Sequence, residues 1–519
     1  MSAVSRRGVL VILALGGLAW WLVFRFWMMQ GDDFMSATIG GARGGHFTFQ
    51  AWANDSWRDY WQATGRQSGS LFRIVLRGGP EVVRWAMTAQ QVGVAAALLL
   101  WSRSTSTPPP VRWAFALAAV CAVPILGWRD PGLHGAALVW AQASFDYVVS
   151  PVLCLVLVGS LVLGTESDER WSWPRTLGVT LLAVVAPLLH ETGSLATLAS
   201  VVVLVVVQRA RARTTQPRVR TLLIVATVSA VVQATAPGMW KRLGAVTGTQ
   251  PAEAGPRLLL LRAANTCWQV GATAGPVVLV VSGLLTVAAV VARGWRSRLT
   301  AFAVVHVLGM GTAVLACRQW SRWPSLTSYG FAMTAEQLGW ATVFLGSVVV
   351  ASLAALVMAG SLVDHLGPLP VVALAGAAGS FMPPLLAGIT ATRALLPLTL
   401  WLLALAFAVL GGWAVQTSRA VERRLAAGTL VLVLGLSAWA VPLWWWRTWT
   451  GLRDNAAAYG PVLAQIERAR AGQVDEVVFP RQYPHPELMY YYAFRLDRYA
   501  PTIRAYYDLP DSVRLVQQP

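Results

Sequence analysis

The chain has 519 residues, of which 56% are hydrophobic and 12% charged, and its mean hydropathy is +0.55. Apolar runs of about 20 residues, the length that crosses a bilayer, recur along it, so the composition excludes a soluble globular protein and indicates a polytopic helical membrane protein. The formal net charge is +18, but the basic residues fall in short groups between apolar runs. This pattern is typical of membrane topology rather than of nucleic-acid binding.

The first apolar run resembles a signal peptide because Arg6 and Arg7 precede it. The run continues to Met29, and no small-residue cleavage site precedes the acidic residues that follow. We therefore predict an uncleaved first membrane helix. The four cysteines are scattered in or near apolar segments without paired or metal-ligand spacing, and we interpret them as packing residues.

Hydropathy predicts about thirteen membrane spans and an all-α fold. The predicted spans are 8–28, 81–101, 112–127, 149–164, 175–189, 192–208, 220–236, 271–292, 299–317, 337–360, 368–389, 394–415 and 425–446. The least distinct are 175–189 and 192–208, which are short and adjoining, and 368–389, which contains two consecutive prolines.

Arginine clusters set the predicted orientation, because positive residues favour the cytoplasmic side of a membrane. The clusters are Arg6 and Arg7, residues 209–220, residues 293–298 and residues 419–424. All fall on one side of the predicted topology, which places the N-terminus in the cytoplasm and the C-terminus outside it.

Two regions outside the spans are long enough to have structure of their own. The first loop, 29–80, contains aromatic-rich segments that suit an amphipathic helix lying in the membrane interface. Residues 448–519 carry a helical pattern, a short strand at 473–480 and a tyrosine-rich helix from 489 to 499. We predict a membrane domain over 1–447 and a small extracytoplasmic α/β appendage over 448–519.

An acidic pair, Asp32 and Asp33, stands where the first helix would reach the surface. Such residues commonly end membrane helices as solvated caps, but carboxylates at this depth are also candidates for chemistry. The same loop carries aromatic residues and a cation that would lie near the pair: Trp57, Tyr60, Trp61 and Arg66. Arg66 would serve either the site or a lipid headgroup.

His190 and Glu191 form a corner between two apolar spans. Ionisable residues near membrane depth favour a functional role, although a helix-end cap is the alternative. Asp146 and Tyr147 add an acid and an aromatic on the same predicted side. Both His190 and Glu191 could ligate a metal ion, but one His-Glu pair without a third ligand is a weak indication. If a divalent metal ion is bound, Asp33 and Glu191 are the two ligands that we consider.

The remaining candidate residues are basic. Pro237 and Gly238 interrupt a helical pattern just before Lys241, the chain's only lysine, and Arg242. These two cations would suit a phosphate at the membrane surface, or would simply snorkel from a turn. Arg393 follows a very short turn and is a further candidate. The alternating arginines and tryptophans of 318–323 would bind a sugar or form an aromatic belt, and we favour the belt.

The order of these motifs resembles an uncharacterised family of bacterial polytopic proteins related to the O-antigen glucosyltransferase type, among the GT-C-like glycosyltransferases. The shared features are Asp-Asp-Phe after the first span, Trp/Tyr/Trp with Gly-Arg in the first loop, the aromatic-Tyr element, the His-Glu corner, Pro-Gly followed by Arg, and a tyrosine-rich tail. That family usually carries Asn where this chain has Met239. The resemblance implies an inverting transfer of one sugar from a polyprenyl-phosphate donor to a cell-envelope glycan or glycolipid, on the outer face of the bacterial plasma membrane.

The residues suit this chemistry. Asp33 or Asp32 would act as general base, Glu191 would orient the acceptor or a metal, and the cations would stabilise a phosphate leaving group. The remaining candidates, Trp57, Tyr60, Trp61, Asp146, Tyr147 and His190, would bind the acceptor or sugar, while Arg66, Lys241, Arg242 and Arg393 would bind the phosphate. The principal alternative is a transporter or lipid flippase, which predicts inverted repeats and charged residues at the bilayer midplane. A polymerase-like lipid-linked transferase and a non-catalytic scaffold are further alternatives.

Overall fold

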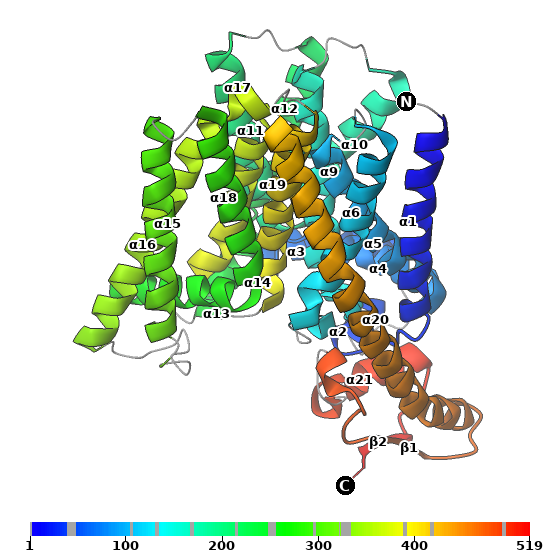
Figure 1. Ribbon diagram of the computed structural model, residues 1–519. Helices are drawn as coiled ribbons and strands as arrows, with labels where there is room; N and C mark the ends of the chain where they lie inside the picture. Colours follow the sequence, from blue (N-terminus) through cyan, green and yellow to red (C-terminus); the bar gives the residue numbers. More distant parts are fainter. Residues whose placement is uncertain are drawn as a thin grey trace.

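A computed structural model shows a membrane bundle of long apolar helices with a small unit attached at one end (Figure 1). It describes residues 3–38, 48–103, 107–129, 134–166, 171–212, 216–247, 256–293, 297–320, 322, 334–387, 392–415, 420–489 and 495–518. Within these residues, 11 helices are long and apolar enough to cross a membrane. The prediction of a multi-pass helical membrane protein is therefore confirmed.

Each predicted span coincides with an apolar helix. The long helices are α1 (Ala3–Phe24), α5 (Gly79–Ser102), α9 (Ser150–Glu166), α11 (Glu191–Ala210), α12 (Pro217–Ala234), α14 (Pro256–Arg293), α15 (Arg298–Trp320), α16 (Ala335–Ser361), α18 (Leu369–Ala387), α19 (Leu396–Val415) and α20 (Ala420–Arg470). Two further apolar helices, α6 (Pro109–Arg129) and α10 (Trp173–Leu189), occupy the third and fifth predicted spans.

The core of the bundle forms around α19, which is buried along nearly its whole length. Its neighbours include α5 and α18, and a glycine lies at each contact; Gly411 of α19, for instance, lies against the backbone of Ser102 in α5. At Gly376 of α18, for example, an added Cβ would lie within 3.0 Å of the Trp401 ring. Close approach through small residues is the usual way in which membrane helices pack, because lipid and side chains are equally apolar.

Helices α14, α15 and α16 form a second packing group beside the main bundle (Figure 1). Their shared core includes Ala264, Ala316 and Phe344. The buried indole of Trp320 donates a hydrogen bond to Asn265 Oδ1 at 3.0 Å. This group leaves wide apolar faces exposed, as expected for helices in contact with lipid.

Short elements gather at the end of the bundle where α1 finishes. They are α2 (Asp32–Ala37), α3 (Phe49–Gln62), α4 (Ser68–Arg77), the π-helices η3 (His134–Val139) and η4 (Phe145–Val149), α8 (Ala141–Ser144), α13 (Pro237–Thr247) and the 3-10 helix η5 (Thr392–Leu395). The four-residue helix α17 (Val363–Leu366) lies at the opposite end (Figure 1). The predicted amphipathic helix of the first loop is α3, and none of its residues is buried.

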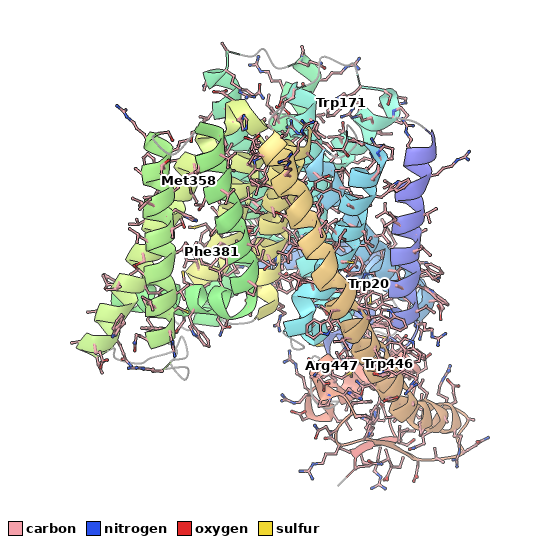
Figure 2. All side chains as sticks on the ribbon, in the orientation of Figure 1. Trp20, Trp171, Met358, Phe381, Trp446 and Arg447 are labelled. Carbon is pink, nitrogen blue, oxygen red and sulfur yellow. The ribbon has the colours of Figure 1, made fainter. Side chains whose placement is uncertain are left out.

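The C-terminal unit is built on the continuation of α20. This helix runs unbroken from the bundle, past Trp446 and Arg447, into the unit (Figure 2). The other elements are β1 (Glu476–Phe479), the 3-10 helix η6 (Pro486–Leu488), α21 (Leu496–Tyr507) and β2 (Arg514–Gln517). Strands β1 and β2 pair in parallel, with Glu476 opposite Arg514 and Phe479 opposite Gln517.

Three details differ from the sequence expectations. The predicted domain boundary at 447/448 falls inside α20, because the apolar span and the following amphipathic pattern continue as one helix. The tyrosine-rich helix, predicted over 489–499, is α21, which continues to Tyr507; residues 490–494 lie outside the described part of the chain. Helix α14 begins at Pro256, well before the predicted start at 271.

Candidate active site

The corner between α10 and α11 places two ionisable side chains inside the bundle. Helix α10 ends at Leu189, His190 has an extended backbone (φ −156°, ψ 144°), and α11 begins at Glu191. His190 Nδ1 accepts a hydrogen bond from the backbone N–H of Thr192 at 3.2 Å and lies 2.9 Å from Thr192 Oγ1. Because Nδ1 is an acceptor, the neutral ring carries its proton on Nε2.

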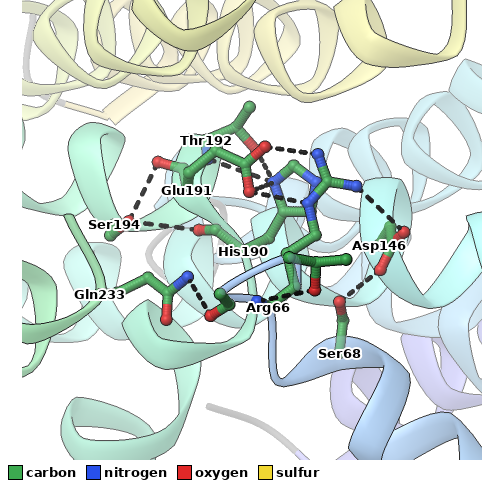
Figure 3. Close-up of polar contacts among 10 residues, drawn as sticks. Arg66, Ser68, Asp146, His190, Glu191, Thr192, Ser194 and Gln233 are labelled. Carbon is green, nitrogen blue, oxygen red and sulfur yellow. Dashed lines mark hydrogen bonds and ion pairs between the residues drawn. The ribbon is translucent and has the colours of Figure 1, made fainter. Parts of the chain in front are cut away.

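Arg66, which belongs to the first loop, extends its side chain toward this corner (Figure 3). Its Nε donates to Glu191 Oε2 at 2.8 Å, and an Nη donates to Glu191 Oε1, so the pair is bidentate. The other Nη lies 3.4 Å from Asp146 Oδ2. The Arg66 side chain is only 8% exposed, so two carboxylates surround a cation that has little access to water.

The loop backbone that presents Arg66 depends on glycine. Gly65 has φ +72°, in the left-handed region that favours glycine, and its carbonyl accepts from Gln233 Nε2 at 2.7 Å. At Gly238, an added Cβ would lie 2.6 to 2.8 Å from the backbone of residues 59–65. The Pro-Gly turn therefore brings α13 against the first loop, beside the Arg66 turn.

Asp146 lies on a π-helix, η4. Its Oδ1 accepts a hydrogen bond from Ser68 Oγ, while its Oδ2 faces Arg66. The neighbouring Tyr147 ring lies 5.2 Å from the His190 ring in a T-shaped contact and 5.9 Å from the Arg66 guanidinium carbon. Single π turns inside helices occur frequently at functional sites because they change the direction of side chains.

Arg242 belongs to the same electrostatic group. Arg66, Glu191, Tyr147 and Asp146 are the charged or ionisable groups that act on its guanidinium. With two arginines and two carboxylates, the group is balanced in charge. The adjacent Lys241 is exposed and lies outside it.

A second acidic centre lies in α2. Asp33 is fully buried, and its carboxylate accepts backbone N–H bonds from Gln30 at 3.2 Å and Gln142 at 3.1 Å. The pKa of Asp33 is raised to about 8, chiefly because the carboxyl group is buried and to a smaller extent because Asp32 is nearby, whereas the two backbone bonds oppose the rise. Asp33 therefore titrates near neutral pH, as a general base or acid requires.

The C-terminal unit covers this acidic pair. Tyr499 of α21 donates a hydrogen bond to Asp32 Oδ1 at 2.5 Å. The Phe34 ring packs against Tyr506 and Tyr507, with centroid distances of 5.6 and 6.0 Å.

One short segment connects the two centres. Gln142 of α8 holds Asp33, and Asp146 of η4, one helical turn or about 6 Å further along, holds Arg66. Trp140, which precedes α8, lies beneath the Arg393 guanidinium, 5.4 Å from its carbon to the ring centroid. Both carboxylate centres and Arg393 therefore meet on residues 140–146.

Other predicted site residues lie elsewhere. Trp57 and Trp61 are 68% and 41% exposed on α3, while the Tyr60 hydroxyl donates to the Val232 carbonyl at 3.0 Å. These aromatics lie on the surface helix rather than among the buried charges. Sequence analysis did not identify Ser68, Gln142 or Thr192, whose roles depend on contacts between distant segments.

A metal site has no support among the residues described. No group of three or more His, Cys, Asp or Glu side chains is arranged there to hold a metal ion. In Glu191, one of the two metal ligands considered, both carboxylate oxygens bond to Arg66. In Asp33, both oxygens accept backbone N–H groups.

Comparison with known proteins gives no relative for this chain. No family model matches it, and neither a curated protein nor a solved structure matches it significantly.

Proposed function

We propose that the chain is a membrane glycosyltransferase that moves one sugar from a polyprenyl-phosphate donor to a cell-envelope glycan or glycolipid, with inversion at the anomeric carbon. The observation that carries the proposal is the pairing of a buried carboxylate, Asp33, whose pKa is about 8, with a nearby arginine–carboxylate group, both anchored on residues 140–146. A base and cations are what such a transfer requires.

In the proposed reaction, Asp33 takes the proton of the acceptor hydroxyl as that oxygen attacks the anomeric carbon. The bond from this carbon to the phosphate oxygen breaks, and the electron pair leaves with the phosphate. Arg242 and Arg393 stabilise the negative charge that develops there. The apolar chain of the donor remains among the lipid-facing helices. Because the energy for transfer lies in the sugar–phosphate bond, no nucleotide site is needed.

Arg66 has a double role in this proposal. Its bidentate bond with Glu191 holds the guanidinium in place, and its remaining Nη contacts Asp146 at 3.4 Å, a longer and weaker bond. A donor phosphate would compete with Asp146 for that Nη while Glu191 remains bound. Asp146 and Tyr147 would then face the acceptor or the sugar.

The order of motifs in the sequence and its resemblance to GT-C-like proteins also support this proposal. It follows that the face carrying the site is extracytoplasmic, with the N-terminus on the other side. The ends of α1 and α20 that carry arginine clusters lie at the end of the bundle opposite the C-terminal unit (Figure 1), as this orientation requires.

The test is sugar transfer by purified protein in nanodiscs, using radiolabelled prenyl-phosphate sugars and envelope glycolipid acceptors. Transfer by the wild type and its loss in Glu191→Gln would support the proposal. Absence of transfer, together with movement of lipid or solute across proteoliposomes, would favour a transporter.

A further inference from the structure

Two neighbouring glutamines, Gln90 and Gln91, lie at the middle of α5. This helix has 24 residues, so both side chains are about 15 to 18 Å from either end, deep within a membrane-spanning segment. They are 8% and 4% exposed. Polar side chains at such depth are rare and usually functional.

Neither amide has a hydrogen-bond partner among the residues that the structure describes. Two other buried glutamines of the bundle differ because their amide nitrogens are paired. Gln208 Nε2 donates to Thr165 Oγ1 at 2.9 Å, and Gln233 Nε2 donates to the Gly65 carbonyl. An unpaired buried amide destabilises the folded state, and more strongly where lipid excludes water. The two α5 amides therefore require a further partner.

Their position connects them with the candidate site. Helix α5 packs against α4, α8 and η4, the elements that carry Ser68, Gln142 and Asp146. Gly93, one turn after Gln90, lies against Val152, where an added Cβ would be 3.4 Å from Cγ1. Gln90 thus lies level with the junction of η4 and α9, a few residues beyond Asp146.

We propose that Gln90 and Gln91 form a subsite for the hydroxyl groups of a sugar ring; this inference rests on the proposed function. A side-chain amide both donates and accepts hydrogen bonds, as a hydroxyl group does. The pair is uncharged, so it suits a neutral ring rather than the phosphate, for which the arginines are available. The ring belongs either to the prenyl-phosphate donor or to the acceptor.

The experiment compares wild type with Gln90→Met and Gln91→Met, which keep volume but remove the amide. The probes are prenyl phosphates of equal chain length, bare or carrying glucose, mannose or arabinose, and the soluble methyl glycosides of the same sugars. We expect each variant to lose about fivefold or more of the wild-type preference for a sugar-bearing probe, the effect of one or two hydrogen bonds. Binding of bare prenyl phosphate should not change.

Loss of preference among the prenyl phosphates would assign the subsite to the donor, and loss confined to the methyl glycosides would assign it to the acceptor. Without a probe, both variants should melt at the same or a higher temperature than wild type, because they remove unpaired amides. Gln208→Met is the matched control: it removes the hydrogen bond from Gln208 Nε2 to Thr165 Oγ1 at the other end of the bundle, so it should lower the melting temperature and leave sugar preference unchanged.

Unchanged sugar preference in both variants would overturn the inference while leaving the proposed function intact, provided the wild type transfers sugar. Failure of the wild type to bind or transfer any of the sugars would instead contradict the proposed function, and the inference would fail with it.

Discussion

Each end of the helix bundle holds a buried arginine–carboxylate group, and the two groups differ in what surrounds them. At the end near α17, Glu166 pairs with Arg103 and lies 3.8 Å from Arg211, which also lies 3.4 Å from the exposed Asp364. These residues stand at helix ends that the group ties together, and the backbone is irregular here too: Arg103 is left-handed (φ +50°), and Gly367 (φ +75°) lies against the Arg103–Glu166 pair. The Nε of Arg103 is buried without a partner among the described residues.

At the other end, Arg66 joins Glu191 and Asp146 through an extended corner, a left-handed glycine and a π-helix. The proton-bearing Nε2 of His190 is buried without a partner among the described residues. A further acid, Asp33, titrates near neutral pH nearby. Irregular backbone and an unpaired buried nitrogen therefore occur at both ends. The comparison teaches that a buried ion pair alone indicates the fastening of helices, whereas the π-helix that carries Asp146 and the second acidic centre at Asp33 distinguish the candidate site.

The largest expected effect is that of Arg66→Ala. It leaves Glu191 and Asp146 buried without their cation, so we expect a loss of about 3–5 kcal/mol of stability and of all transfer activity. Arg103→Ala is the matched change, and it should cost less because Arg211 remains beside Glu166. Thermal unfolding in detergent measures both. Equal losses would contradict the distinction between the two ends.

Glu191→Gln separates activity from stability. The amide keeps the shape but cannot accept a bidentate bond, while Asp146 still neutralises Arg66, so the fold should persist. Transfer should fall by about 10²–10³-fold, the range for a misplaced catalytic group. Glu166→Gln at the other end should lower the melting temperature without changing transfer. A fall in transfer caused by Glu166→Gln would contradict the claim that only the Arg66 end of the bundle takes part in the reaction.

The ionisation of Asp33 gives a pH dependence with a definite sign. Its pKa is about 8 in the folded protein, whereas the ordinary value, which we take for the unfolded chain, is 3.8. Between these two pH values the folded protein therefore binds one proton that the unfolded chain does not. Stability from this group is full below about pH 4 and declines as pH rises to about 8. Asp33→Asn should flatten this decline in melting temperature.

If Asp33 is the base, kcat/KM of the wild type should rise about tenfold per pH unit below pH 8 and then level off. A rate that is constant from pH 6 to pH 9 would argue against this role.

The smallest effects concern the cations of α13. Arg242→Ala removes a charge that interacts with the Arg66 group, so donor binding should weaken by about tenfold, as for one charge-assisted contact. Lys241→Ala removes an exposed charge and should change binding by less than about twofold. Titration with a prenyl-phosphate sugar compares the two, and equal effects would place the phosphate at the surface of α13.

Hydropathy predicted the helices well because a bilayer demands apolar segments of fixed length. The same rule could not place the start of α14 or reveal that α20 continues to Arg470, since neither depends on contact with lipid. Strand β2 was also missed. Its parallel pairing with β1 joins segments separated by a helix, a contact that local patterns do not encode.

The sequence predicted which ionisable residues belong to the candidate site, but not which of their side chains contact one another. The His190-Glu191 corner and Asp146 were recognised because ionisable residues are costly near a membrane. That Arg66 binds Glu191, 125 positions away, depends on how the first loop folds back onto α11. Trp57 and Trp61 suit a sugar site by composition, yet α3 holds them at the surface, where their aromatic rings suit the membrane interface.

The most direct test of the central claim is transfer of a radiolabelled sugar from prenyl-phosphate donors by purified wild type and by Asp33→Asn, with melting curves recorded for both. We expect transfer by the wild type and none by a variant that folds normally. Full transfer by Asp33→Asn, or no transfer by wild type with any donor, would contradict the account.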